Sequence, residues 1–247
     1  MEIKPLTTLI FDLDGTLCRY EESLEDALLK TFDLKDPEDL PLTPTNYQEG
    51  FGVEFDRAID GEVERQDLDF RTRVFWNLLQ DDDSFDSSEV ISFGEKFTKI
   101  RENSLTLFDD VPPVFEELTG KFKLGLLTNG PSSLQGRKIE KLGIESWFDS
   151  ITISGQHSMA KPDPRIFDIA MEKLNSGREE TIYIGNSLKY DVLGANKAKL
   201  PVIWRKDGEE EEVEGAIPNL VINELTELIE GKITLSFAEH GKRRIKL

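Results

Sequence analysis

The 247-residue sequence has little of the chemistry that depends on sulfur or imidazole. It contains one cysteine, Cys18, and two histidines, His157 and His240. A single cysteine excludes an intrachain disulfide and a thiolate zinc cluster, and two histidines argue against a histidine-rich metal site. Any metal that this protein binds should therefore be a hard cation held by oxygen atoms.

The sequence also lacks long apolar runs and an excess of basic residues. No run approaches the roughly 18 apolar residues that a membrane span needs, and residues 1–5 have no signal-peptide character. We therefore expect a soluble, cytoplasmic protein with no membrane partner. The net charge of −19 argues against a nucleic-acid partner, because phosphate backbones are bound by clustered lysine and arginine.

Two carboxylates directly follow the first apolar run. Asp12 and Asp14 come just after Leu9-Ile10-Phe11 and just before a Gly-Thr pair. Residues i and i+2 of a strand share a face, but a turn that begins after Asp14 lets the two carboxylates reach opposite sides of one bound atom. One carboxylate can then attack while the other moves a proton. An isolated pattern of this kind is equally typical of a turn in which both aspartates only accept backbone hydrogen bonds.

Three further polar clusters follow along the chain and favour the catalytic interpretation. They contain hydroxyl, amide, lysine and acid side chains: Thr128-Asn129, Lys161, and Asn186 with Asp191. With Asp12 and Asp14, they resemble the four motifs of the haloacid dehalogenase-like hydrolase superfamily in order and spacing. The resemblance covers residues 8–16 and about 108–206. The segment after Thr128 is most similar to the subgroup containing N-acylneuraminate-9-phosphatase and nucleotidase-like enzymes.

The resemblance implies a phosphatase that hydrolyses a small phosphorylated metabolite through an aspartyl-phosphate intermediate. Asp12 would be the nucleophile, and Asp14 would protonate the leaving oxygen and then activate water. Thr128 and the amide of Asn129 would bind the transferring phosphoryl group, and Lys161 would place a positive charge between nucleophile and phosphate.

The same resemblance implies a Mg²⁺ cofactor, with one departure from the usual pattern. Its ligands would be Asp12, the backbone carbonyl of Asp14, Asn186 and Asp191, the last directly or through water. The superfamily usually has an aspartate where this chain has Asn186. An asparagine still offers a carbonyl oxygen, but it lacks the negative charge, so we expect weaker metal binding.

Two other functions fit the same residues. A 2-haloacid dehalogenase would use the same Asp12 nucleophile without a metal, although Asp14 would then be superfluous and no halide-binding residues can be assigned. A non-catalytic binding protein of the same fold is the third reading, for which Asn186 is the only sequence evidence. The sequence identifies neither the substrate nor the oligomeric state.

Short apolar runs alternate with helical segments in the parts of the chain that carry the motifs. We expect strands near residues 8–13, 122–128, 150–154, 181–185 and 201–205, with helices between them. This alternation predicts an α/β fold with a doubly wound, Rossmann-like parallel sheet. Ligands of such sheets collect beyond the carboxyl ends of the strands, where Asp12, Thr128 and Asn186 would lie.

The segment between the first strand and the first core helix is too long for an ordinary connection. Apolar residues recur in it at helical spacing, for example at Phe70, Val74 and Leu78. We interpret residues 17–107 as an inserted α-helical cap domain and residues 1–16 and 108–247 as the hydrolase core. Residues 18–105 contain 23 acidic and 10 basic side chains, which we interpret as a solvated helical surface.

Overall fold

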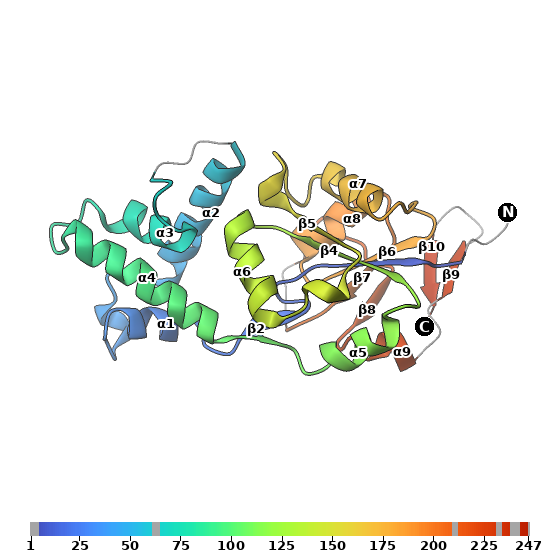
Figure 1. Ribbon diagram of the computed structural model, residues 1–247, viewed down its shortest axis with the longest axis horizontal. Coiled ribbons are helices and arrows are strands. Elements are labelled where there is room, and N and C mark those ends of the chain that lie inside the picture. The colour runs from blue at the N-terminus through green and yellow to red at the C-terminus, as the bar shows by residue number, and fades with distance from the viewer. Residues whose placement is uncertain (1–4, 61–64, 209–211, 231–233, 238–242, 247) are drawn as a thin grey trace. The chain divides into compact units, whose positions relative to one another are not determined.

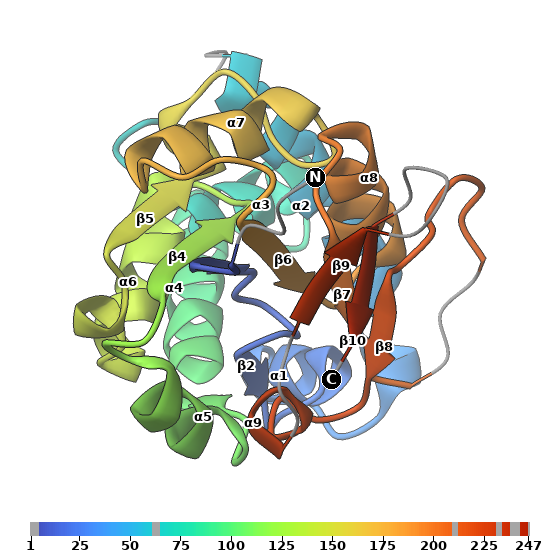
Figure 2. The same ribbon diagram turned by 90° about the vertical axis from the view of Figure 1, so that its right-hand side faces the viewer.

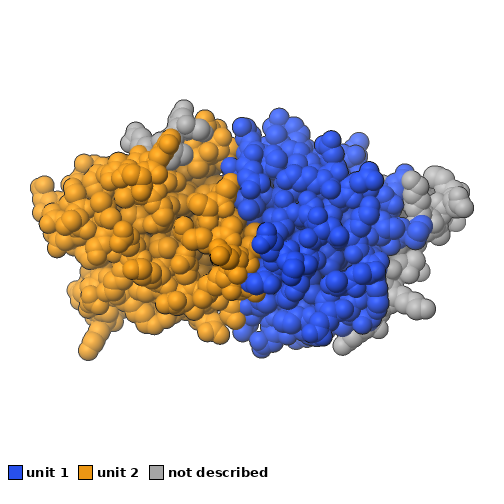
Figure 3. Space-filling view, viewed as in Figure 1, with its two compact units in different colours: residues 1–19, 107–129, 143–247 blue, residues 20–106, 130–142 orange. Residues whose placement is uncertain are grey.

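The computed structural model describes residues 5–60, 65–208, 212–230, 234–237 and 243–246. The chain forms two compact units, coloured separately in Figure 3. Unit 1 comprises residues 1–19, 107–129 and 143–247, and unit 2 comprises residues 20–106 and 130–142. Helix α6 (Ser132–Leu142), which we expected in the core, groups with unit 2. The boundaries of a core and a cap domain stay a prediction.

Within its described residues, unit 1 contains a six-stranded parallel sheet in the order β5-β4-β1-β6-β7-β8 (Figure 1). The strands are β1 (Thr8–Phe11), β4 (Lys123–Thr128), β5 (Ser150–Ile153), β6 (Thr181–Gly185), β7 (Val202–Arg205) and β8 (Leu220–Ile222). The chain adds strands on one side of β1 and then on the other. This arrangement confirms the doubly wound α/β fold.

Helices cover both faces of this sheet (Figures 1 and 2). Helices α7 (Pro164–Lys173) and α8 (Leu193–Lys197) lie on one face, and α5 (Val111–Leu118) and α9 (Glu227–Glu230) lie on the other. Ile10 of β1 packs in the cluster that includes residues of α7 and α8, while the next residue, Phe11, places its ring 5.0 Å from that of Phe115 in α5. Both faces of β1 are buried, which explains its continuous apolar sequence.

Short elements complete unit 1. They are the 3₁₀ turns η2 (Glu145–Trp147) and η3 (Ser154–Gln156), the π-helical turn η4 (Leu188–Val192), and the antiparallel pair β9 (Thr234–Phe237) and β10 (Arg243–Lys246). The turn η4 runs directly into α8, so the helix that follows β6 has a wider first turn. A π-turn inside a helix is frequent at functional sites, and η4 carries Asp191.

Unit 2 is helical, as the apolar spacing predicts. Its helices, besides α6, are α1 (Leu24–Thr31), η1 (Pro37–Asp39), α2 (Pro44–Asp60), α3 (Phe70–Leu79) and α4 (Ser87–Asn103). Two short strands, β2 (Cys18–Tyr20) and β3 (Leu105–Leu107), pair with each other where the chain enters and leaves the unit. None of the described helices is both long and apolar enough to cross a membrane.

The core of unit 2 is built from aromatic rings. The ring of Phe97 lies 4.7 Å from that of Tyr47 and 5.2 Å from that of Phe75. Aromatic pairs at such distances add stabilisation beyond their buried area. The carboxylate of Asp86 accepts a hydrogen bond from the backbone N–H of Glu89, and the carboxylate of Glu89 accepts one from the backbone N–H of Asp86. This capping box fixes the start of α4.

Gly94 in α4 provides a test of how closely α4 packs on α3. A Cβ at this position would lie 2.5 Å from the Cα of Thr72, so Gly94→Ala should lower the free energy of unfolding by about 1–3 kcal/mol. Gly52→Ala in α2 is the matched control, because nothing lies within 4 Å of its added Cβ, and it should gain roughly 0.5–1 kcal/mol. Urea denaturation followed by circular dichroism measures both. Equal stability of the two variants would contradict the close approach of the helices.

Candidate active site

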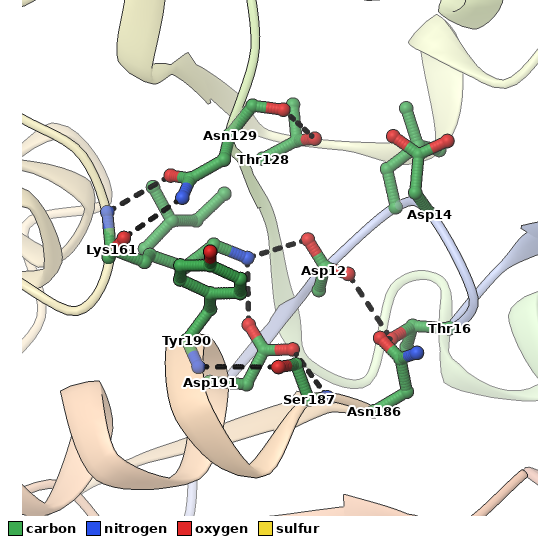
Figure 4. A network of polar contacts seen from close by, with 12 residues as sticks. Asp12, Asp14, Thr16, Thr128, Asn129, Lys161, Asn186, Ser187, Tyr190 and Asp191 are labelled. Carbon is green, nitrogen blue, oxygen red and sulfur yellow. Dashed lines mark hydrogen bonds and ion pairs between the residues drawn. The ribbon is translucent and has the colours of Figure 1, made fainter. Parts of the chain in front are cut away.

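The carboxyl ends of β1, β4 and β6 bring together residues that are far apart in the sequence (Figure 4). Asp12 follows β1, Thr128 ends β4, and Asn186 follows β6. The backbone N–H of Asp12 donates to the carbonyl of Ile184 at 2.9 Å, so the end of β1 is held against β6. Lys161 reaches the same point from the loop before α7. The predicted convergence of these residues at one sheet edge is therefore found in the structure.

The ammonium group of Lys161 is the centre of the site. Its Nζ donates to Oδ1 of Asp12 at 2.6 Å and to Oδ1 of Asp191 at 2.7 Å. A third bond, at 3.0 Å, goes to the hydroxyl of Tyr183. The side chain of Lys161 is only 3% exposed. An ammonium has three N–H donors, and the three acceptors here come from the loop after β1, from β6 and from η4.

These buried charges perturb one another. Burial raises the pKa of Asp12 to about 7, and Lys161 opposes this shift while Asp191 and Asp14 add to it. Burial lowers the pKa of Lys161, but the attraction of Asp12 and Asp191 is larger, so this pKa is raised overall. Asp12, Asp14 and Asp191 together carry more charge than Lys161 neutralises. The site thus has an excess of negative charge, which a bound cation would offset.

Asp191 is directed toward Lys161 and the loop after β6. Its Oδ1 also accepts from the hydroxyl of Tyr183 at 2.8 Å, and its Oδ2 accepts from the backbone N–H of Ser187 at 2.9 Å. A Cβ on Gly185 would lie 2.4 Å from Cγ of Asp191, so the carboxylate packs directly over the glycine backbone. In this arrangement Asp191 positions Lys161 and the loop. Its role as a metal ligand stays a prediction.

Asn186 and Asp12 each direct a side-chain oxygen toward the hydroxyl of Thr16. The hydroxyl of Thr16 lies 3.3 Å from Oδ2 of Asp12 and 3.3 Å from Oδ1 of Asn186. A hydroxyl has one proton, so it can satisfy only one of these two acceptors at a time. Gly15, at φ +79°, passes so close to Asn186 that an added Cβ would lie 2.2 Å from its Nδ2. Glycine is therefore required here for conformation and for space.

The side chain of Asn129 binds the backbone of Lys161. Its Nδ2 donates to the Lys161 carbonyl and its Oδ1 accepts from the Lys161 N–H, both at 2.9 Å. Because both side-chain amide atoms are used in this way, the predicted contact of Asn129 with a phosphoryl group would be made by its backbone N–H. Thr128 is buried at the end of β4. Asp14 is partly exposed, with the sulfur of Cys18 3.9 Å from its Oδ1.

Several residues of the site are not indicated by the sequence motifs. Tyr183 lies within an apolar run, and the signal for its role is that a buried tyrosine hydroxyl needs a hydrogen-bond partner. The indole N–H of Trp204 donates to the Asn186 carbonyl at 2.6 Å. Arg205 donates to the Thr16 carbonyl at 2.6 Å and is held by Asp110 at 3.0 Å. Strand β7 thereby fixes the backbone of both loops that carry candidate metal-binding oxygens.

Residues 6–199 match the family described as haloacid dehalogenase-like hydrolase. The chain belongs to this family. The match contains all four polar clusters and the whole of unit 2, so the resemblance seen in the motifs extends across the segment that the motifs left unexplained. The prediction of a hydrolase of this superfamily is confirmed.

Relatives of this hydrolase include enzymes that act on phosphate esters. The chain is 35% identical over 112 residues to the pyrimidine 5'-nucleotidase YjjG of Escherichia coli, a match that covers 45% of this chain and 50% of that protein. It is 31% identical over 143 residues to the N-acylneuraminate-9-phosphatase of Mus musculus, covering 57% of each. The chain thus spans little more than half the length of these curated relatives.

A solved structure with the same fold is that of the putative hydrolase YfnB of Bacillus subtilis, bound to magnesium. Its TM-score against this chain is 0.64 at 24% identity, and the superposition covers 92% of this chain and 98% of that one. At this identity the similarity shows the fold alone. It confirms the Rossmann-like architecture with an inserted helical segment.

Lys161→Met tests the charge balance at the centre of the site. Without the ammonium, Asp12 and Asp191 would face each other with no cation, so we expect a loss of about 3 kcal/mol in the free energy of unfolding at pH 8 without divalent metal. The deficit should shrink at pH 5, because the folded variant would hold raised carboxyl pKa values and bind more protons than the unfolded chain.

Urea denaturation of the hydrolase and its variants at both pH values measures this effect. Lys197→Met, at an exposed position of α8, is the control and should change stability by less than about 0.5 kcal/mol. A deficit for Lys161→Met that is absent, or that grows as the pH falls, would show that Lys161 is not the charge partner of both carboxylates.

Proposed function

We propose that this hydrolase is a magnesium-dependent phosphatase that acts on a small-molecule phosphate ester through an aspartyl-phosphate on Asp12. The observation that carries the proposal is the orientation of the Asp12 carboxylate. Its Oδ1 is held by Lys161, while its Oδ2 faces Thr16 and Asn186. The nucleophile is thus oriented by one buried cation and has its second oxygen directed to a cluster of oxygen ligands. The names of the two curated relatives support the same reaction class.

The reaction would proceed in two displacement steps. An oxygen of Asp12 attacks phosphorus, and the bond from phosphorus to the ester oxygen breaks while Asp14 gives its proton to that leaving oxygen. Asp14 then takes a proton from water, the water oxygen attacks phosphorus, and the bond to Asp12 breaks. Inorganic phosphate and the free carboxylate are the products. Lys161 and Thr128 would stabilise the charge on the phosphoryl oxygens.

The donor atoms at the site fit Mg²⁺. The residues that would hold it are Asp12, Asn186 and the backbone carbonyl of Asp14, with Asp191 close to them. No three histidine, cysteine, aspartate or glutamate side chains within the described ranges form a metal cluster by themselves. Mg²⁺ needs only one or two carboxylates, because it keeps several waters and takes substrate phosphate oxygens. When bound, it would offset the charge of the phosphate that approaches Asp12.

An assay with p-nitrophenyl phosphate and magnesium tests the proposal. The 2-haloacid dehalogenase reading predicts turnover of 2-chloropropionate without metal and none of the phosphate ester. The non-catalytic reading predicts turnover of neither compound. Release of phosphate that depends on magnesium distinguishes the proposed function from both.

Asp12→Asn should abolish turnover and leave the fold intact. The amide has nearly the same shape as the carboxylate but is a far poorer nucleophile, so we expect less than about 1% of the wild-type rate. Steady-state phosphate release measures the rate, and far-UV circular dichroism checks the fold. A variant that kept more than a few per cent of the rate would exclude the covalent mechanism.

Asp14→Asn should also be strongly impaired, for a different reason. Its amide can neither protonate the leaving oxygen nor activate water. With a substrate whose leaving group needs no proton, such as p-nitrophenyl phosphate, the variant should accumulate the phosphorylated enzyme. Mass spectrometry after rapid acid quenching should then show an added phosphoryl group on Asp12, and Asp12→Asn/Asp14→Asn is the control that cannot carry it.

Asn186→Asp tests whether this residue contacts the metal. A charged ligand in place of the amide should lower the magnesium concentration for half-maximal activity about tenfold, which corresponds to roughly 1.4 kcal/mol. Asn103→Asp, at an exposed position of α4, is the control with the same change in net charge. A magnesium titration at fixed substrate and ionic strength compares them. An equal half-point in both variants would place Asn186 outside the metal site.

A further inference from the structure

Unit 2 gathers cationic side chains around the ring of Tyr20. Lys138 Nζ and the guanidinium carbons of Arg101 and Arg71 lie 5.7, 3.7 and 5.9 Å from the ring centroid. These residues come from α6, α4 and α3. The ring attracts each cation, but the cations repel one another. Such a gathering is unexpected in a segment that contains 23 acidic and 10 basic residues between positions 18 and 105.

Two buried donors beside this cluster have no hydrogen-bond partner. Arg71, which is 4% exposed, donates through Nη2 to the hydroxyl of Tyr20 at 2.7 Å, but its Nη1 is unpaired. The hydroxyl of Tyr47, which is 5% exposed, is also unpaired. A buried polar group without a partner costs about 1–3 kcal/mol, and such groups are rare in native structures. An acceptor that binds here would recover this loss.

Three carboxylates of unit 2 that lie near the cluster make other contacts, although Oε2 of Glu22 has no hydrogen-bond partner. Asp69 caps α3 by accepting the backbone N–H groups of Arg71 and Thr72. Glu102 pairs with Arg137 at 2.8 Å, and Glu22 pairs with Lys30. Arg101 donates to the backbone carbonyl of Glu22 at 2.7 Å.

Among the described residues of unit 2, Arg101 forms no ion pair with a carboxylate. Burial lowers the pKa of Arg101, and Arg71 adds to this shift, which the tyrosines and Glu22 only partly offset. Tyr20 and Arg101 are partly exposed, so solvent and solutes reach the cluster on their side. The missing component is an acceptor with negative charge.

We propose that Tyr20, Tyr47, Arg71, Arg101 and Lys138 bind one oxyanionic group, a carboxylate or a phosphate, of a small molecule. A guanidinium group can donate two parallel N–H bonds to two oxygens of either anion, and the Tyr47 hydroxyl adds a neutral donor. Binding of this anion to unit 2 does not depend on the proposed phosphatase function.

Direct binding tests the site without any enzyme assay. Isothermal titration of the full chain with malonate and with sulfate, at low ionic strength and without divalent metal, gives the affinity for each anion. Arg101→Met should weaken binding at least tenfold. Lys99→Met removes an exposed cation from the same helix and should change binding by less than twofold.

Tyr47→Phe separates a binding role from a structural one. Because the Tyr47 hydroxyl has no partner in the protein, its removal should leave the melting temperature unchanged or higher. Binding of the anions should nevertheless fall about threefold or more. A variant with lower stability and unchanged binding would assign the hydroxyl a purely structural role and overturn its part in the site.

Two results would overturn the proposal. One is the absence of binding of both anions at tens of millimolar, and the other is equal binding by Arg101→Met and Lys99→Met. A protein without phosphatase activity that still binds malonate through Arg101 would refute the proposed function and leave this site in place.

Discussion

The contact between the Lys161 ammonium and the carboxylates of Asp12 and Asp191 is the interaction on which the candidate active site depends. The buried carboxylates lie 2.6 and 2.7 Å from the buried ammonium, in a place where each charge alone would be strongly disfavoured. The contact joins the ends of β1 and β6 to the loop before α7. Removing the ammonium would leave both carboxylates without a cation, so Lys161 holds these segments in one arrangement.

Side-chain hydrogen bonds fix the backbone of the loops around this contact. The Asn129 amide clamps the backbone of Lys161, and Trp204 and Arg205 of β7 hold the carbonyls of Asn186 and Thr16. Glycines at 15 and 185 leave room for side chains to pack against the loops. In the function that we propose, a carboxylate held by these contacts would need little reorganisation when a substrate binds, which is the condition for electrostatic catalysis.

The two units place their charge in opposite ways. Unit 1 concentrates negative charge at the ends of its strands, which suits a cation and, through it, a phosphate. Unit 2 is acidic overall, yet it concentrates positive charge around Tyr20. The first arrangement supports the phosphatase reaction that we propose for this hydrolase. The second supports the anion site that we propose in unit 2.

The local pattern of the sequence determined the strands, the helices and the polar residues that end them, because period and strand-end chemistry depend on neighbours in the chain. It also placed Asp12, Thr128 and Asn186 at one edge of the sheet, since parallel strands end together. The tertiary structure alone decided which atoms meet. Tyr183 became a partner of Lys161, and α6 grouped with unit 2, through contacts between residues far apart in the sequence. Such contacts depend on register, crossovers and side-chain packing, and no local pattern encodes them.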